Sequence, residues 1–86
     1  MAYSIEYAPE AVRALDRMPH DIRRRIILRI ESLADGPRRP GAVKLSGCEA
    51  YRIRAGDYRV IYGIADQRMA VLIVCIAHRR EVYRGF

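Results

Sequence analysis

Three arginines spaced along a short segment indicate the chemistry of this chain. Within residues 51–64, Arg52 and Arg54 precede a Gly56-Asp57 pair and Arg59 follows it. Runs rich in Tyr, Ile and Val on both sides of a Gly-Asp pair are typical of a β-hairpin with a two-residue turn. A guanidinium group presents a planar fork of N–H donors that matches a phosphate group.

The length of the turn predicts which side chains share a face. With a two-residue turn, Arg54 lies opposite Arg59 and Arg52 lies opposite Ile61. Side chains alternate along a strand, so the three arginines are expected on one face of the hairpin. Like charges directly opposite each other destabilise a sheet, by up to about 1 kcal/mol. Folding does not require this arrangement, and we therefore predict that the arginine-bearing face binds a polyanion.

Composition and charge narrow the class of protein. The 86 residues are enough for a single small domain, 1–86, and the net charge of +6 favours nucleic acid or an acidic protein as a partner. The two cysteines, Cys48 and Cys75, are in no CxxC pattern, which argues against a zinc site and a disulfide scaffold. Acidic residues are scattered singly, so no metal-dependent nuclease site is expected.

The sequence also indicates where the protein acts. The N-terminus has no basic head followed by a long apolar segment, as a signal peptide would. The longest apolar run, 69–77, is too short to span a bilayer. We expect a cytoplasmic protein with no membrane partner. No Gly-rich phosphate loop, HExxH or GxSxG motif is present, and no cofactor is expected.

The order of the predicted elements gives the fold class. Residues 3–7 alternate as a half-buried strand, Pro9 begins a helix, and a second helix is expected from Pro19 to about Ala34. A brief strand at 43–45, the hairpin and an apolar strand at 69–77 follow. We predict an α+β fold: an N-terminal strand, a helical hairpin, then antiparallel strands forming one twisted sheet with the two helices packed on one face.

A cluster of arginines and tyrosines can cleave RNA without a metal ion. The ribose 2′-hydroxyl is the nucleophile, and the protein orients the backbone and stabilises negative charge on the phosphoryl oxygens. His78, Arg79 and Tyr83 follow the last predicted strand, and we expect them to complete such a site.

Four segments carry a resemblance to a known family. The sequence resembles the RelE/ParE superfamily of type II toxins, and its RelE-like branch in particular, in Val43-Lys44-Leu45-Ser46-Gly47, Tyr51-Arg52-Ile53-Arg54, Gly56-Asp57-Tyr58-Arg59-Val60-Ile61-Tyr62 and His78-Arg79-Arg80-Glu81-Val82-Tyr83. The resemblance covers essentially the whole chain. It implies a RelE-like fold and a ribosome-dependent endoribonuclease, an mRNA interferase, neutralised by an antitoxin encoded beside it.

The resemblance also implies residue roles. Arg59 and Arg79 would stabilise charge on the scissile phosphate, Arg52 and Arg54 would hold the backbone, and Tyr83 would stack on a base or orient the 2′-hydroxyl. Arg52 and Arg54 have a second interpretation as contacts to antitoxin carboxylates.

The remaining site residues have alternatives as well. RelE-type sites often have Lys before the turn, and arginine cannot act as a base. His78 is therefore the candidate for acid–base chemistry, with a Tyr83 phenolate or proton transfer to water as alternatives. Lys44 and Arg80 are assigned to RNA binding, with a structural salt bridge and a plain surface charge as the respective alternatives.

Three hypotheses of function follow. The first is a toxin that cleaves ribosome-bound messenger RNA, is covered on its basic face by an antitoxin, and reaches operator DNA only through that antitoxin. The second is a ParE-like toxin that inhibits DNA gyrase without nuclease activity. The third is a degenerate relative that only binds its partner.

Overall fold

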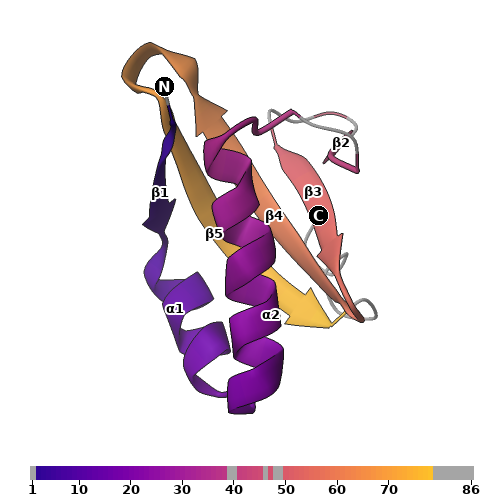
Figure 1. The fold of residues 1–86 in the computed structure, drawn as a ribbon. Helices are drawn as coiled ribbons and strands as arrows, with labels where there is room; N and C mark the ends of the chain where they lie inside the picture. The colour runs from indigo at the N-terminus through magenta and orange to yellow at the C-terminus, as the bar shows by residue number, and fades with distance from the viewer. Residues whose placement is uncertain (1, 39–40, 46, 48–49, 79–86) are drawn as a thin grey trace.

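The computed structural model describes residues 2–38, 41–45, 47 and 50–78. The first half has one strand followed by two helices, and the second half is mainly strands (Figure 1). In chain order they are β1 (Ser4–Tyr7), α1 (Pro9–Asp16), α2 (His20–Glu31), the 3-10 turn η1 (Ser32–Ala34), β2 (Val43–Lys44), β3 (Tyr51–Ala55), β4 (Tyr58–Ala65), the 3-10 turn η2 (Asp66–Arg68) and β5 (Ala70–His78).

The helical hairpin forms as its sequence predicts. Pro9 occupies the first turn of α1, where its missing N–H costs no hydrogen bond. Pro19 stands at the N-cap of α2, which therefore starts one residue later than predicted. The predicted end near Ala34 corresponds to η1, which tightens the last turn after Glu31.

The strands form one mixed sheet in the order β1-β5-β4-β3-β2. The prediction of antiparallel strands is confirmed for β2 to β5. The first strand differs, because β1 pairs in parallel with β5. The helical hairpin carries the chain from β1 at one edge of the sheet to β2 at the other, and the antiparallel strands then return to place β5 beside β1. The fold is thus α+β with an open five-stranded sheet.

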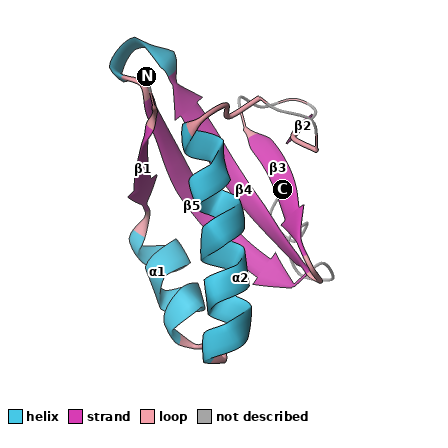
Figure 2. Cartoon of the chain, viewed as in Figure 1, coloured by secondary structure: helices cyan, strands magenta, loops and turns pink. Residues whose placement is uncertain are grey.

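The two helices cover one face of the sheet, as predicted (Figure 2). Apolar side chains of the helices meet alternate strand residues in a single core. Tyr62, at 0% exposure, is the largest buried side chain, and its hydroxyl donates a hydrogen bond to the Pro37 carbonyl at 2.6 Å. The buried members of this core are Ala11, Leu15, Ile26, Ile30, Leu33, Ile53, Ala55, Val60, Tyr62, Val71, Ile73 and Ile76.

A β-bulge interrupts the pairing of β4 with β5. Ile61 pairs with Cys75, whereas the next residue, Tyr62, pairs with Ile73. Val74 is the extra residue of β5, and it shifts the alternation of side chains on the strand beyond it. Ile76 and His78 consequently lie on the same face as Ile73.

At one end of the sheet, side chains from distant parts of the chain form hydrogen bonds and ion pairs with one another. Arg38 pairs with both carboxylate oxygens of Asp66, at 3.0 and 2.9 Å, and donates its Nε–H to the Tyr51 hydroxyl at 3.2 Å. The Tyr3 hydroxyl donates to Asp66 Oδ1 at 2.8 Å. Arg68 forms an ion pair with Glu6 at 2.6 Å. Among the described residues, no helix is long and apolar enough to cross a membrane.

Candidate functional site

The β3–β4 hairpin has the predicted register. Arg54 pairs with Arg59, Arg52 with Ile61, and the intervening pairs are those that a two-residue turn gives. Gly56 has a φ of 62°. Asp57 is not at positive φ, so the turn corresponds to the type that has glycine at its first central position. The short turn fixes the positions of all three arginines.

Arg52, Arg54 and Arg59 lie on the sheet face that α1 and α2 leave uncovered, and we call these residues the arginine face. Arg54 is exposed, and the other two are partly buried. The Nε atoms of Arg52 and Arg59 are inaccessible to solvent. A guanidinium whose stem is packed in this way loses less side-chain entropy when it binds an anion. The structure therefore brings the three hairpin arginines together in a partly preorganised arrangement.

The neighbouring strand residues add no charge to this face. Beside Arg52 lies Ile61, which is 1% exposed, followed by Cys75 on β5. Beside Arg59 lies Ala77. Burial raises the pKa of the Cys75 thiol, so that it stays protonated at neutral pH. The described strands thus surround the arginines with neutral side chains, which favours an anionic ligand.

His78 lies on the opposite face of the sheet. It pairs with Tyr58, and the two rings meet edge to face with their centroids 5.7 Å apart. Together with Arg17 of the α1–α2 turn they line a pocket under the helical hairpin. The structure therefore does not bring His78 together with the arginine face.

Lys44 is also placed away from the arginine face. It pairs with Tyr51 of β3, whereas Val43 pairs with Arg52, so Lys44 lies on the helix-covered side at the sheet edge. Arg79, Arg80 and Tyr83 lie outside the described residues, and their predicted roles stay predictions. Among the described residues, no group of three or more His, Cys, Asp or Glu side chains could hold a metal ion.

The tyrosines of the β3–β4 hairpin lie on the core side of the sheet. Tyr62 is fully buried, and Tyr51 stacks on it with ring centroids 5.9 Å apart. Tyr58 packs against the core near the hairpin turn. These three residues support the strands that hold the arginines.

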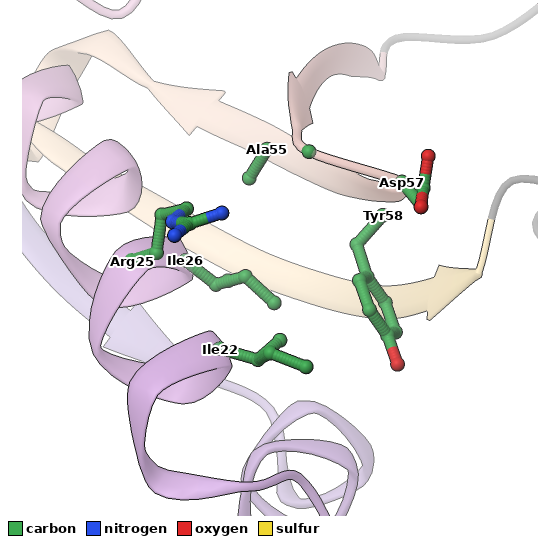
Figure 3. A pocket seen from close by; sticks show the side chains of 7 residues that line it. Ile22, Arg25, Ile26, Ala55, Asp57 and Tyr58 are labelled. Carbon is green, nitrogen blue, oxygen red and sulfur yellow. The ribbon is translucent and has the colours of Figure 1, made fainter.

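Arg25 and Arg29 of α2 reach the hairpin from the helix side, which the sequence analysis did not predict. Arg29 Nε donates a hydrogen bond to the Arg54 carbonyl at 3.2 Å. Arg25 lines a pocket of about 180 Å³ between α2 and the hairpin turn, shown in Figure 3. The only sequence signal was their four-residue spacing beside the apolar stripe of α2.

The family comparison matches nearly the whole chain. Residues 5–83 match the model of a family described as the ParE toxin of the type II toxin-antitoxin system, parDE.

Individual relatives carry RelE names. The chain is 30% identical to Toxin RelG of Mycobacterium tuberculosis, over 98% of this chain and 99% of that protein. It is 25% identical to the mRNA interferase toxin RelE of Escherichia coli K12, over 96% of this chain and 92% of that protein. Among solved structures, the fold is similar to an archaeal RelE–RelB complex from Pyrococcus horikoshii, with a TM-score of 0.80 and 30% identity over 95% of this chain and 100% of that one.

Proposed function

The chain belongs to the ParE toxin family of type II toxin-antitoxin systems, and we propose that within this family it acts as a RelE-like mRNA interferase, an endoribonuclease that cleaves messenger RNA on the ribosome. The observation that supports this most directly is the convergence of Arg52, Arg54 and Arg59 on one face of the β3–β4 hairpin. A substrate of this kind implies action in the cytoplasm.

The chemistry proposed for this face is attack of a ribose 2′-hydroxyl on the adjacent phosphorus. The bond from phosphorus to the 5′-oxygen of the next nucleotide breaks, leaving a 2′,3′-cyclic phosphate and a 5′-hydroxyl. Arg59 lies on β4 directly opposite Arg54 and is assigned to the phosphoryl oxygens, where charge increases in the transition state. Arg52 and Arg54 hold the flanking backbone. Arg79 and Tyr83 are proposed to complete the site.

Proton transfer is assigned to solvent. Arginine remains protonated at neutral pH and cannot take the proton of the 2′-hydroxyl. His78 lies on the other face of the sheet, with its ring against Tyr58. We therefore assign catalysis to charge stabilisation and positioning, with water accepting the proton. No metal ion is proposed, because guanidinium groups have no lone pair to offer a metal and supply the positive charge themselves.

The partners proposed for this toxin match its charge. An antitoxin with an acidic, amphipathic segment would wrap the domain and neutralise the arginine face, as the net charge of +6 allows. The RelE–RelB complex supports a partner of this kind. Operator DNA would be bound through the antitoxin. Lys44 and Arg80 are proposed to contact RNA outside the scissile nucleotide.

The decisive experiment measures cleavage of a translated message by primer extension with purified ribosomes. Arg59→Ala should lower the cleavage rate by about 10²–10³-fold, the usual cost of removing one charge-stabilising donor. Arg24→Ala, an exposed arginine on α2, is the matched control and should cleave normally. Full activity of Arg59→Ala would remove the site assignment.

The ParE name of the matched family keeps a second function testable. A ParE-like toxin would inhibit DNA gyrase, so DNA synthesis would stop first after induction and a damage response would follow. An mRNA interferase stops protein synthesis first. Pulse labelling of protein and DNA in the same culture distinguishes them, and we expect protein synthesis to stop first.

A further inference from the structure

We propose that Arg25, Arg29 and Arg54 form a second binding strip, which holds the phosphates of single-stranded RNA next to the nucleotide that is cleaved. This inference rests on the proposed function, because it assigns the strip to the same RNA strand. The strip follows the edge of β3 that faces α2, and it is separate from the guanidinium groups assigned to the scissile phosphate.

The first observation is the contact that fixes Arg29 at this edge. Its Nε–H donates to the Arg54 carbonyl at 3.2 Å, which places the guanidinium beside β3. Of the five N–H donors of an arginine, this bond uses one, and four remain to bind an anion. Among the described residues, no carboxylate forms an ion pair with Arg25, Arg29 or Arg54. Their charges are therefore not neutralised by the described part of the chain.

The second observation is that the backbone leaves room for this guanidinium. Gly41 has a φ of 99°, and a Cβ there would lie 2.9 Å from Arg29 Nη2. A side chain at this position would displace the guanidinium group. Gly41 thus keeps open the space that Arg29 occupies beside β3.

The third observation is that the cations follow one line. Arg25 and Arg29 are four residues apart on α2, so their Cβ atoms are about 5–6 Å apart along the helix. Arg25 borders the pocket between α2 and the hairpin turn, opposite Ala55 (Figure 3). Lys44 lies farther along the same edge, on the helix-covered side. A row of cations along an edge suits a row of phosphates better than a single small anion.

The edge itself is open enough to accept a strand of RNA. Among the described residues, β2 pairs only with Tyr51 and Arg52, so the β3 edge from Ile53 to Ala55 faces Arg29 instead of another strand. The side chain of Arg54 points to the arginine face while its carbonyl holds Arg29. One residue therefore connects the strip to the proposed catalytic arginines. Asp57 at the turn marks the end of the strip, because its carboxylate repels phosphate.

The test measures binding of a short 2′-O-methyl RNA oligonucleotide to the full chain by fluorescence anisotropy over a range of salt concentrations. Each phosphate contact contributes about 0.7 to the slope of log K against log salt for a single strand. Arg25→Gln and Arg29→Gln should each lower that slope by about 0.7. Arg24→Gln on the same helix is the control; it removes the same charge and should leave the slope unchanged.

The alternative explanation is that Arg29 only supports the edge of β3. Arg29→Lys keeps the charge and loses the planar fork, so it should restore most of the slope if phosphate is the ligand. A purely structural arginine would instead lower the melting temperature in both Arg29 variants and leave the slope unchanged, which would overturn the proposal. Equal losses in the Arg24, Arg25 and Arg29 variants would also overturn it, because they would indicate a general effect of net charge.

Two further outcomes separate this proposal from others. If Arg25→Gln and Arg29→Gln lose binding of poly-glutamate but not of RNA, the strip is a docking surface for an acidic protein and the proposal is wrong. Because the 2′-O-methyl oligonucleotide cannot be cleaved, its binding is independent of the Arg59→Ala cleavage experiment. The prediction for RNA binding and the prediction for cleavage can therefore fail independently of each other.

Discussion

At the scale of single residues, the side of the sheet on which each side chain lies decides its role. Arg59 of β4 pairs with Ala77, the neighbour of His78 on β5. The register nevertheless puts Arg59 and His78 on opposite faces of the sheet. The edge-to-face contact of His78 with Tyr58 gives the histidine a packing role. Histidine is a residue type suited to catalysis, but His78 packs against the hairpin on the helix-covered face of the sheet.

This placement predicts that His78 is dispensable for the chemical step. His78→Ala should cleave ribosome-bound message at the rate of the unsubstituted protein, measured under single-turnover conditions. Its rate should rise with pH without an inflection near pH 6.5, the ordinary pKa of histidine. Arg59→Ala serves as the inactive comparison. A loss of activity in His78→Ala with an unchanged melting temperature would restore the histidine as the acid–base group.

Tyr62 allows a prediction for stability. Its buried hydroxyl donates to the Pro37 carbonyl at 2.6 Å, and Tyr62→Phe would leave that buried acceptor without this donor. We expect a loss of about 1–3 kcal/mol in the free energy of unfolding, measured by urea titration. Tyr3→Phe, which removes a partly exposed hydrogen bond to Asp66, should cost less. Equal losses of unfolding free energy in the two variants would contradict the expectation that the buried hydrogen bond contributes more to stability than the exposed one.

The same residue predicts alkaline unfolding. Burial raises the pKa of Tyr62 to about 12 from an ordinary value of 10.0. The folded protein therefore holds this proton more tightly than the unfolded chain. The stabilisation is complete below pH 10 and is lost as the pH rises towards 12. Urea midpoints across this range should fall, and they should fall less steeply in Tyr62→Phe.

At the scale of elements, the hairpin turn determines the spacing of the arginines. Gly56 has a φ of 62°, a conformation that costs residues with a Cβ about 1–2 kcal/mol. Gly56→Ala should therefore destabilise the protein by about that amount and slow cleavage by disturbing Arg54 and Arg59. Gly63→Ala is the matched control. Gly63 is on β4 without positive φ, and its Cβ would meet nothing within 4 Å. Urea titration and primer extension check both variants.

The elements also show how far the sequence could predict the site. A two-residue turn allows only one register, so the positions of Arg52, Arg54 and Arg59 followed from the Gly-Asp pair. Positions 69–77 are apolar almost without interruption, so no alternation indicated which face His78 would occupy. The face of the sheet on which Lys44 lies depends on how the two-residue strand β2 pairs with β3. No local sequence pattern specifies that pairing. Arg29 reaches β3 only through tertiary packing.

At the scale of the whole molecule, ion pairs at one end of the sheet tie the N-terminus to later elements. Arg38 holds the pKa of Asp66 below its usual value, and Arg68 does the same for Glu6. Both carboxylates release their protons more readily in the folded protein. The resulting stabilisation is present above their ordinary pKa values, 3.8 and 4.5, and is lost as the pH falls further.

We therefore predict an acid-sensitive fold whose sensitivity depends on these pairs. Melting temperature should decline as the pH drops below about 4.5, and the decline should be shallower in Asp66→Asn than in the unsubstituted protein. Asp16→Asn, on the exposed side of α1, is the control for loss of one carboxylate. Identical declines in all three proteins would show that the Arg38–Asp66 pair does not contribute to acid sensitivity.

The register of β5 beyond its bulge has an evolutionary consequence for the whole sheet. Shortening the strand by Ala77 alone, with Ile76 still paired with Val60, would move His78 from its place opposite Tyr58 to the place opposite Arg59. A titratable imidazole would then join the cationic surface without any substitution. A single-codon deletion could thus convert a surface that only stabilises charge into one that also exchanges protons.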